Sequence, residues 1–521
     1  MKRILLCIIS LAMVLALCVG CNKNDDTSGS NNNDSGQSST ENNNTAGGGE
    51  NTGNTDGTDN TGSTDNTDNS NGSEGLGGEG DNSQTPEGAV LNGKALEEYV
   101  IVYPAGDSDY NKRAAEYIRD TVKEKTGITL KINKDSAAES PCEIIVGETA
   151  RALSAELDAD TYGLEFSMVA KGTQIALEGD YFIIAAAAYY FVDTYITGDS
   201  FDSNVSEEAL VALPITEKAE NHILLIGDGM GLYQTLLYSY RDADATGLSD
   251  GEDSFYGYLF PNRGFARTNS LSGTTDSAAS GTALATGYKT INEYIGRDSE
   301  LNDVMSLTEL ASSLGKATAV MSTEAVTGAT PAAFSAHANN RNDTSDISGD
   351  QSALSKKEGT IIRTVGDYYT KSQINMAMKR NIRSVMNQIV DDEDGFFVMY
   401  EEAYIDKHCH SNNISSAFQA LIRFNQAIGV FMEYAFYNPD TAVIITADHE
   451  TGSLLPNGNG GLSYGSGGHT SHNVPVFAYG EGMEVFDGRV IENVQIPKTV
   501  AHMWGVEDFG DPRSQYEALT K

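Results

Sequence analysis

The sequence predicts an α/β fold in which a central, mostly parallel β-sheet is flanked by helices, with a smaller N-terminal α/β or α+β domain ahead of it. Residues 222–226 and 441–446 are short, continuous apolar runs, which are typical of parallel strands buried on both faces. Residues 414–436 carry apolar side chains at helical spacing, which indicates a long helix covering such a sheet. Before residue 215, strand-like and helix-like segments alternate, as they do in small α/β domains.

The chain begins with the layout of a secretory signal peptide, because two basic residues precede an apolar run over residues 4–19. The run ends at Cys21 and resembles the lipobox of bacterial lipoproteins. We therefore expect residues 1–20 to be removed and Cys21 to be lipidated, with an ordinary cleaved signal and an uncleaved anchor as alternatives. This predicts an extracytoplasmic protein that a lipid anchors to a bacterial cell membrane.

Residues 21–91 are expected to form a disordered tether, because they are mostly Asn, Gly, Ser, Thr and Asp with almost nothing apolar. Such a segment buries too little surface to offset the entropy lost when it is ordered. A random coil of this length spans roughly 45 Å, which is enough to hold a folded domain clear of a membrane.

The charge of the chain excludes one class of partner. It carries 74 acidic against 34 basic residues, a formal net charge of −40, and the tether contributes only −12 of it. A surface that acidic repels phosphate backbones, so no nucleic acid is expected as a specific ligand. Five Cys residues among 521 are too few for a disulfide framework.

The smaller domain is expected over residues 92–215, with strands at 99–103, 130–132 and 143–147 and helices at 109–126 and 182–195. This block resembles the accessory domains that precede catalytic domains in some secreted glycoside hydrolases. Contact with a glycan or with the cell envelope therefore stays open for it. Its sequence contains no constellation of catalytic residue types.

The larger domain, residues 218–521, carries the candidate metal ligands at the ends of its expected elements. Because the carboxyl ends of parallel strands meet at one edge of a sheet, we expect these side chains to lie close together. Mixed imidazole and carboxylate sets suit zinc, whereas carboxylate and hydroxyl oxygens suit magnesium. The candidates are Asp228, Glu401, Asp406, His410, Asp448, His449 and His469.

The candidate nucleophile is Ser277, in a run of small residues that allows a helix to begin near Asp276. A Ser at a helix N-terminus faces unpaired N–H groups and the positive end of the helix dipole, which together favour a bound phosphate. Taken in isolation, Asp276 or Ser277 is better explained as a mere N-cap before a helix. No Gly-x-Ser-x-Gly elbow and no evident His–Asp partner are present, so activation of Ser277 by a metal fits better than a triad.

Residues 220–480 resemble the alkaline phosphatase family. The resemblance rests on segments that occur in the family's order, at 223–231, 275–280, 329–334, 336–341, 405–406 and 446–450.

The resemblance implies a role for each candidate. Ser277 matches the nucleophile that forms a phosphoserine intermediate, and Arg341 matches the guanidinium that grips two phosphate oxygens. The three metal sites would be a first zinc site of Asp406, His410 and His469, a second of Asp228, Asp448, His449 and the Ser277 hydroxyl, and a magnesium site of Glu401, Thr330 and the shared Asp228.

Two positions depart from the family's pattern. Gly328 stands where members commonly carry an Asp or His that supports the magnesium site, so we expect a magnesium ion held weakly and largely by water. Glu402 and Ala403 stand where two glycines are usual.

The implied function is extracytoplasmic hydrolysis of small phosphate monoesters, with release of inorganic phosphate, by two zinc ions and one magnesium ion. Two alternatives stay open: a phosphodiesterase of the same superfamily, and a catalytically weak protein that binds glycans or the envelope. A homodimer also stays open.

Overall fold

The computed structural model describes residues 88–106, 109–157, 163–240, 254–357, 359–366 and 374–520. The expected signal peptide, Cys21 and nearly all of the expected tether lie outside the described residues. Within the described part of the chain, no helix is long and apolar enough to cross a membrane.

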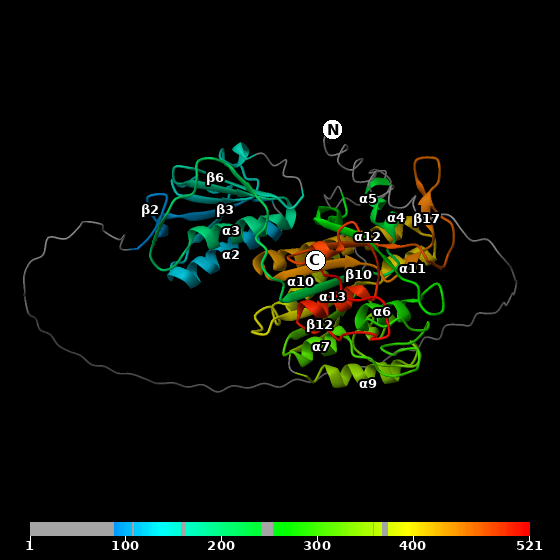
Figure 1. The fold of residues 1–521 in the computed structure, drawn as a ribbon. Coiled ribbons are helices and arrows are strands. Elements are labelled where there is room, and N and C mark those ends of the chain that lie inside the picture. The colour runs from blue at the N-terminus through cyan, green and yellow to red at the C-terminus, as the bar shows by residue number, and fades with distance from the viewer. Residues whose placement is uncertain are drawn as a thin grey trace, which may run out of the picture. The chain divides into compact units, whose positions relative to one another are not determined.

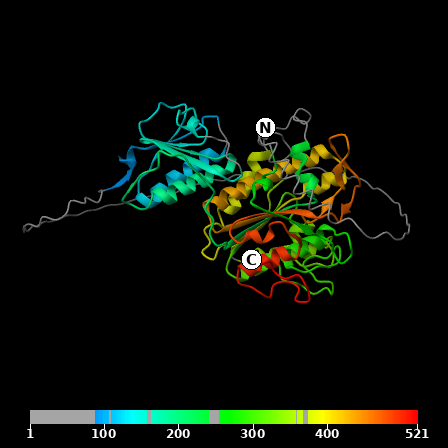
Figure 2. The same ribbon diagram turned by 45° about the horizontal axis from the view of Figure 1, so that its top comes forward.

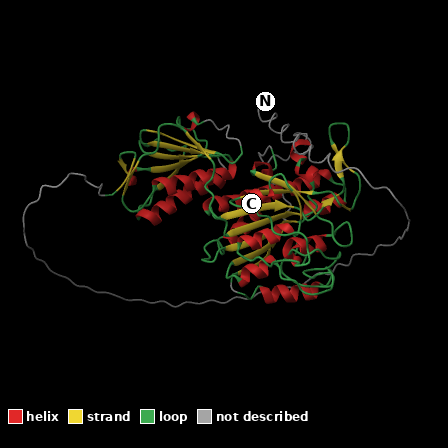
Figure 3. Ribbon diagram, in the orientation of Figure 1, coloured by secondary structure: helices red, strands yellow, loops and turns green. Residues whose placement is uncertain are grey.

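The first domain is built on a six-stranded mixed sheet with the order β4-β3-β5-β7-β6-β9, on which two helices pack (Figures 1 and 3). Neighbouring strands are parallel from β4 to β7, and β6 pairs antiparallel with both β7 and β9. The elements are β3 Val100–Tyr103, α2 Asp109–Thr126, β4 Lys131–Lys134, β5 Glu143–Val146, β6 Phe166–Lys171, β7 Gln174–Glu178, η4 Tyr181–Ile183, α3 Ile184–Tyr195 and β9 Leu210–Ala212. The strands and helices expected for this domain are present, displaced by only a few residues.

The folded chain starts slightly earlier than the sequence indicates. Strand β1 (Ala89–Leu91) lies inside the range expected for the tether, and it pairs with β2 (Lys94–Ala95) and with β8 (Phe201–Ser203). Its apolar side chains are buried by partners from the far end of the domain. Local composition does not report such a long-range contact, so the sequence assigned these residues to the tether.

The second domain is built on an eight-stranded sheet with the order β13-β12-β14-β10-β15-β20-β11-β21 (Figure 1). Only β20 runs antiparallel to its neighbours, so the predicted mostly parallel α/β fold is confirmed. Every residue of the central strands β10, β12, β14 and β15 is buried, which explains their continuous apolar sequences. The strands are β10 Asn221–Gly227, β11 Asn262–Arg267, β12 Ala317–Ser322, β13 Thr360–Thr364, β14 Phe396–Glu402, β15 Thr441–Thr446, β20 Val474–Tyr479 and β21 Val490–Glu492.

Helices cover both faces of this sheet, as Figures 1 and 2 show. The long helix α12 contacts β10, β14 and β15 on one face, and α10 packs beside it. A group that includes α6, α7 and α8 contacts the strands from the other face. The bounds are α6 Ser277–Thr286, α7 Leu307–Ser313, α8 Ala329–Ala333, α9 Thr344–Leu354, α10 Ile374–Met386, α11 Tyr404–His410, α12 Ile414–Tyr437 and α13 Gln495–Met503.

Side chains of the first domain contact the second along α12. The rings of Tyr117 and Tyr437 stack with their centroids 4.0 Å apart. The buried Glu433 accepts hydrogen bonds from Arg113 of the first domain, at 2.5 Å, and from Arg383 of α10, at 2.9 Å. One carboxylate therefore joins both domains.

Candidate functional site

Adjacent parallel strands bring the acidic residues to one edge of the second sheet. In the register of β10 with β14, Ile226 lies beside Glu401, and in the register of β10 with β15 it lies beside Thr446. Asp228 and Asp448, each two residues beyond these paired positions, therefore extend from the same edge as Glu401. All three residues are at most 5% exposed.

Two groups of metal-ligating atoms lie at this edge and share His449. In each group, one atom per residue falls within 4.8 Å of the others; the groups are Asp406 with His449 and His469, and Asp228 with Asp448 and His449. His410 belongs with the first group, because its Nε2 lies 3.3 Å from Asp406 Oδ2 and 3.1 Å from His469 Nε2. The structure therefore brings together the residues assigned to both zinc sites.

Backbone carbonyls orient two of these imidazoles. His410 Nδ1 donates to Gly467 O at 2.7 Å, and His469 Nδ1 donates to Thr275 O at 2.9 Å. With Nδ1 used in this way, Nε2 of each ring faces Asp406. A hydrogen bond that fixes one ring nitrogen and leaves the other for a cation is the usual arrangement at metal sites.

The chemistry of the donor atoms fits bound cations. Asp228 Oδ1, Asp448 Oδ2 and Glu401 Oε1 are buried and make no hydrogen bond to any described residue. Burial and neighbouring carboxylates raise the pKa of Asp228 well above its usual range and the pKa of Asp448 to about 6. Burial also raises the pKa of Glu401 to about 8. Divalent cations here would satisfy the lone oxygens and offset the mutual repulsion of the carboxylates.

Burial lowers the pKa of His449 to about 4, so its imidazole is neutral, as a metal ligand must be. The hydrogen bond with Asp406 instead raises the pKa of His410 to about 9. A cation at the first group would therefore have to displace a proton from His410.

The residues assigned to magnesium form a third group beside the second. Thr330 lies on the short helix α8, and its hydroxyl is close enough to Glu401 to lower the pKa of that carboxyl in part. Ser322 at the end of β12 donates to Glu401 Oε2 at 2.5 Å. This hydrogen bond leaves the other oxygen, Oε1, without a hydrogen-bond partner among the described residues.

The nucleophile candidate lies where the sequence predicts it. Ser277 is the first residue of α6, and Asp276 is its N-cap, accepting a hydrogen bond from the Ala279 N–H at 3.0 Å. The Ser277 hydroxyl is buried, with its Oγ 3.1 Å from His449 Nε2. Nucleophile and shared imidazole are thus in direct contact.

Arg341 is held at the mouth of this site. Its Nη1 donates to Asp276 Oδ2 at 3.3 Å, and its side chain stays 34% exposed. One N-cap carboxylate therefore orders both the start of α6 and the guanidinium. Arg341 keeps donors for a ligand, since only this hydrogen bond is formed to described residues.

Sequence reasoning missed several supporting residues. Thr451 donates to Asp406 Oδ1 at 2.5 Å and lies 3.2 Å from His449 Nδ1, so it connects the two groups. In the sequence, the available signal for Thr451 was its position two residues after His449. His472, three residues after His469, is 54% exposed and lies near Glu450, outside both groups.

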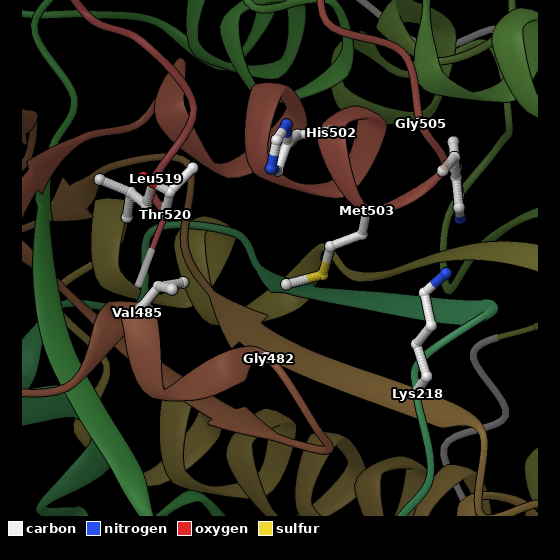
Figure 4. Close-up of a pocket in the computed structure, with 9 residues that line it drawn as sticks. Lys218, Gly482, Val485, His502, Met503, Gly505, Leu519 and Thr520 are labelled. Carbon is white, nitrogen blue, oxygen red and sulfur yellow. The ribbon is translucent and has the colours of Figure 1, made fainter.

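A pocket of about 440 Å³ lies elsewhere, beside the C-terminal end of α13 (Figure 4). Met503 and Val485 line it together with Lys218, which precedes β10. No carboxylate is among its lining residues, so it does not offer the ligands found at the strand ends.

Comparisons with known proteins point to one family. The sequence pattern of the alkaline phosphatase family matches residues 219–378 and 369–463. Alkaline phosphatase 3 of Bacillus subtilis is 26% identical over 336 residues, which are 54% of this chain and 71% of the relative. Alkaline phosphatase of Escherichia coli is 40% identical over 129 residues, which are 24% of this chain and only 26% of that enzyme.

Among solved structures, alkaline phosphatase from the Antarctic bacterium TAB5 is 27% identical, with a TM-score of 0.48, over 56% of this chain and 99% of that one. Two variants of the TAB5 enzyme are described with Mg bound in the M3 site. On the match of the family's sequence pattern over residues 219–463 and of the two curated relatives, the second domain of this chain belongs to the alkaline phosphatase family.

Proposed function

We propose that this phosphatase-superfamily hydrolase cleaves phosphate monoesters outside the cytoplasm and releases inorganic phosphate. The observation that carries the proposal is the buried Ser277 hydroxyl, 3.1 Å from the His449 imidazole that both ligand groups share. A nucleophile in contact with ligands of two cations is suited to phosphoryl transfer, because cations can stabilise both the attacking and the leaving oxygen.

The ligands divide over three cations in this proposal. Asp406, His410 and His469 would hold one zinc ion, Asp228, Asp448 and His449 would hold a second, and Glu401, Thr330 and Asp228 would hold magnesium. When bound, these ions supply the Lewis acidity that lowers the pKa of the hydroxyl nucleophile and stabilises the leaving oxygen.

The chain itself orients and transfers the phosphoryl group. Ser277 Oγ attacks phosphorus, the bond to the ester oxygen breaks, and the alcohol leaves while phosphate stays on Ser277 as phosphoserine. Attack by water then breaks the bond from Ser277 Oγ to phosphorus and releases inorganic phosphate. The N–H groups at the start of α6 favour the negative charge of the phosphoryl oxygens. Arg341, ordered by Asp276, presents two N–H groups to two of them.

Turnover of two model substrates tests the function. Zinc-loaded full-length protein should hydrolyse p-nitrophenyl phosphate much faster than bis-p-nitrophenyl phosphate, and a chelator should abolish both activities. Faster cleavage of the diester would favour a phosphodiesterase. Absence of both activities in zinc-loaded protein would contradict the proposal.

The place of action follows from the N-terminal sequence. Cys21, lipidated, would anchor the enzyme outside the cell, and the polar segment after it would separate the anchor from the site. The Cys21→Ala protein should then appear in the soluble fraction with unchanged turnover. Retention on membranes after a salt wash would contradict lipid anchoring and favour an uncleaved anchor.

A further inference from the structure

The Glu324 side chain occupies the space that a side chain at position 328 would need. A Cβ built on Gly328 would lie 2.6 Å from Glu324 Oε1 and 3.0 Å from the Ala325 carbonyl oxygen. Gly328 has an ordinary backbone conformation, with φ of −58°, which any residue can adopt. The glycine is therefore not required by the turn. What it provides is room for the Glu324 carboxylate.

Glu324 is tied to the group assigned to magnesium through Ser322. The Ser322 hydroxyl accepts a hydrogen bond from the Glu324 N–H at 3.0 Å and donates to Glu401 Oε2 at 2.5 Å. The charge of Glu324 also contributes to the raised pKa of both Glu401 and Asp228, as expected for carboxylates that share one site. Glu324 thus lies beside both acidic residues assigned to magnesium.

This place has unsatisfied oxygens and excess negative charge. Glu401 Oε1, Asp228 Oδ1 and Thr330 Oγ1 belong to residues that are at most 5% exposed, and none makes a hydrogen bond of good geometry to a described residue. The Lys407 ammonium pairs with Glu324 Oε2 and balances only one of the three carboxylates. A hard divalent cation with oxygen ligands would balance the other two.

We propose that Glu324 supplies the carboxylate of the third cation site, in place of the side chain that Gly328 lacks, and that the cation is Mg²⁺. The inference rests on the proposed function, because it shares Asp228 and Glu401 with that assignment. It changes the expectation from sequence: the site is not left to water alone, since a residue four positions upstream provides the acid.

The test is magnesium affinity, measured by titration calorimetry on full-length protein that already holds zinc. Glu324→Gln should weaken Mg²⁺ binding about 10- to 100-fold, the usual effect of losing a ligand or its support. Glu156→Gln is the matched control, because Glu156 is also a partly exposed glutamate paired with a lysine, Lys171, but in the first domain. The control should bind Mg²⁺ like the wild type.

A second experiment moves the carboxylate from position 324 to position 328 and tests whether the two side chains would occupy the same place. Gly328→Asp alone should not tighten Mg²⁺ binding, because its Cβ meets Glu324 Oε1. Glu324→Ala combined with Gly328→Asp should recover at least part of the affinity lost in Glu324→Ala, since the clash is then reduced to the Ala325 carbonyl. Tighter binding in Gly328→Asp alone would overturn the proposal.

An unchanged Mg²⁺ affinity in Glu324→Gln would also overturn the proposal, and so would the absence of Mg²⁺ binding by the wild type. The cation beside Glu324 would then be the Lys407 ammonium. Zinc content and p-nitrophenyl phosphate turnover, measured on the same samples, separate this failure from failure of the proposed function. A protein without zinc or turnover would contradict the function, whereas active zinc protein indifferent to Glu324→Gln would contradict only this inference.

Discussion

The Glu402 carboxylate and the Arg423 guanidinium form a buried ion pair behind the candidate site, with side chains 0% and 5% exposed. Arg423 donates to both carboxylate oxygens, at 2.5 and 3.2 Å, and the Tyr404 N–H donates to Glu402 Oε1 at 3.1 Å. The Glu402 carbonyl accepts the Asp228 N–H. Glu402 therefore links Arg423 of helix α12 to two backbone N–H groups, that of Tyr404 at the start of α11 and that of Asp228 just after β10.

Removing one partner of this pair should be costly. Glu402→Gln leaves a buried guanidinium without its counter-charge, which is expected to reduce the free energy of unfolding by about 3–5 kcal/mol. The double variant Glu402→Leu with Arg423→Met should regain most of that stability, because it buries no unpaired charge. Urea unfolding of zinc-loaded protein measures both.

The double variant also separates positioning from stability. If the pair positions Asp228 and the start of α11, zinc affinity should stay reduced in the double variant even when its stability recovers. Recovery of both together would show that the pair is only structural. The sequence marks Glu402 as a departure from the family's pattern, but its partner lies on a different helix and carries no local signal.

The candidate cation-binding edge was predictable for a physical reason. Its ligands follow continuous apolar runs, and buried parallel strands must end side by side, so Asp228, Glu401 and Asp448 converge whatever the details of the helices. Supporting residues such as Thr451, in the short strand β16 (Glu450–Thr451), and Glu324, in the loop after β12, have no comparable pattern. Which residue fills the space beside Gly328 depends on a local backbone path, and only the structure gives it.

Ser277→Ala should fold and bind zinc but lose turnover about 10³-fold or more, because no covalent phosphoryl intermediate can form. Trapping ³²P-phosphate at acid pH should label the wild type at Ser277 and leave the variant unlabelled. Ser335→Ala is the control: its buried hydroxyl donates to the Pro331 carbonyl, so the variant should label normally. Label on any other residue would contradict the assignment of the nucleophile.

Arg341→Ala should weaken binding of substrate and inorganic phosphate about 10- to 100-fold, the range for losing hydrogen bonds to a charged group. Arg341→Lys should be intermediate, since it keeps the charge but loses the planar fork. Steady-state kinetics with phosphate as a competitive inhibitor measures both. Zinc content should not change in either variant, and its loss would show that Arg341 supports the metal ligands instead.

Glu433→Ala should uncouple the two domains, because it removes the carboxylate that Arg113 and Arg383 share. We expect stability to fall by about 3–5 kcal/mol and the calorimetric transition to broaden or divide. Asp120→Asn is the control: its exposed pair with Arg119 should contribute less than about 1 kcal/mol. A single, unshifted transition in Glu433→Ala would indicate that the remaining contacts, which include the Tyr117–Tyr437 stack and the Arg383–Asp109 ion pair, suffice to hold the domains together.

His222 should make stability fall at acid pH. Its ring is buried at the start of β10, where the Trp504 indole N–H donates to Nδ1 at 3.0 Å and Met503 Sδ lies 3.4 Å from Nε2. Burial, with a further contribution from the charge of Lys316, lowers the pKa of His222 from 6.5 to about 3. Between these values the unfolded chain binds a proton that the folded chain does not. This one group therefore reduces the free energy of unfolding by about 1.4 kcal/mol for each pH unit below 6.5.

His222→Gln isolates this contribution, because a glutamine carbonyl can still accept from Trp504 but does not titrate. Unfolding measured from pH 8 to pH 4 should give parallel curves for variant and wild type above pH 7, where the histidine is neutral in both states. Below pH 6.5 the wild type should lose stability more steeply, by the slope of one proton. Curves that stay parallel down to pH 4 would show that His222 becomes protonated inside the fold, which requires the strand end to open and admit water.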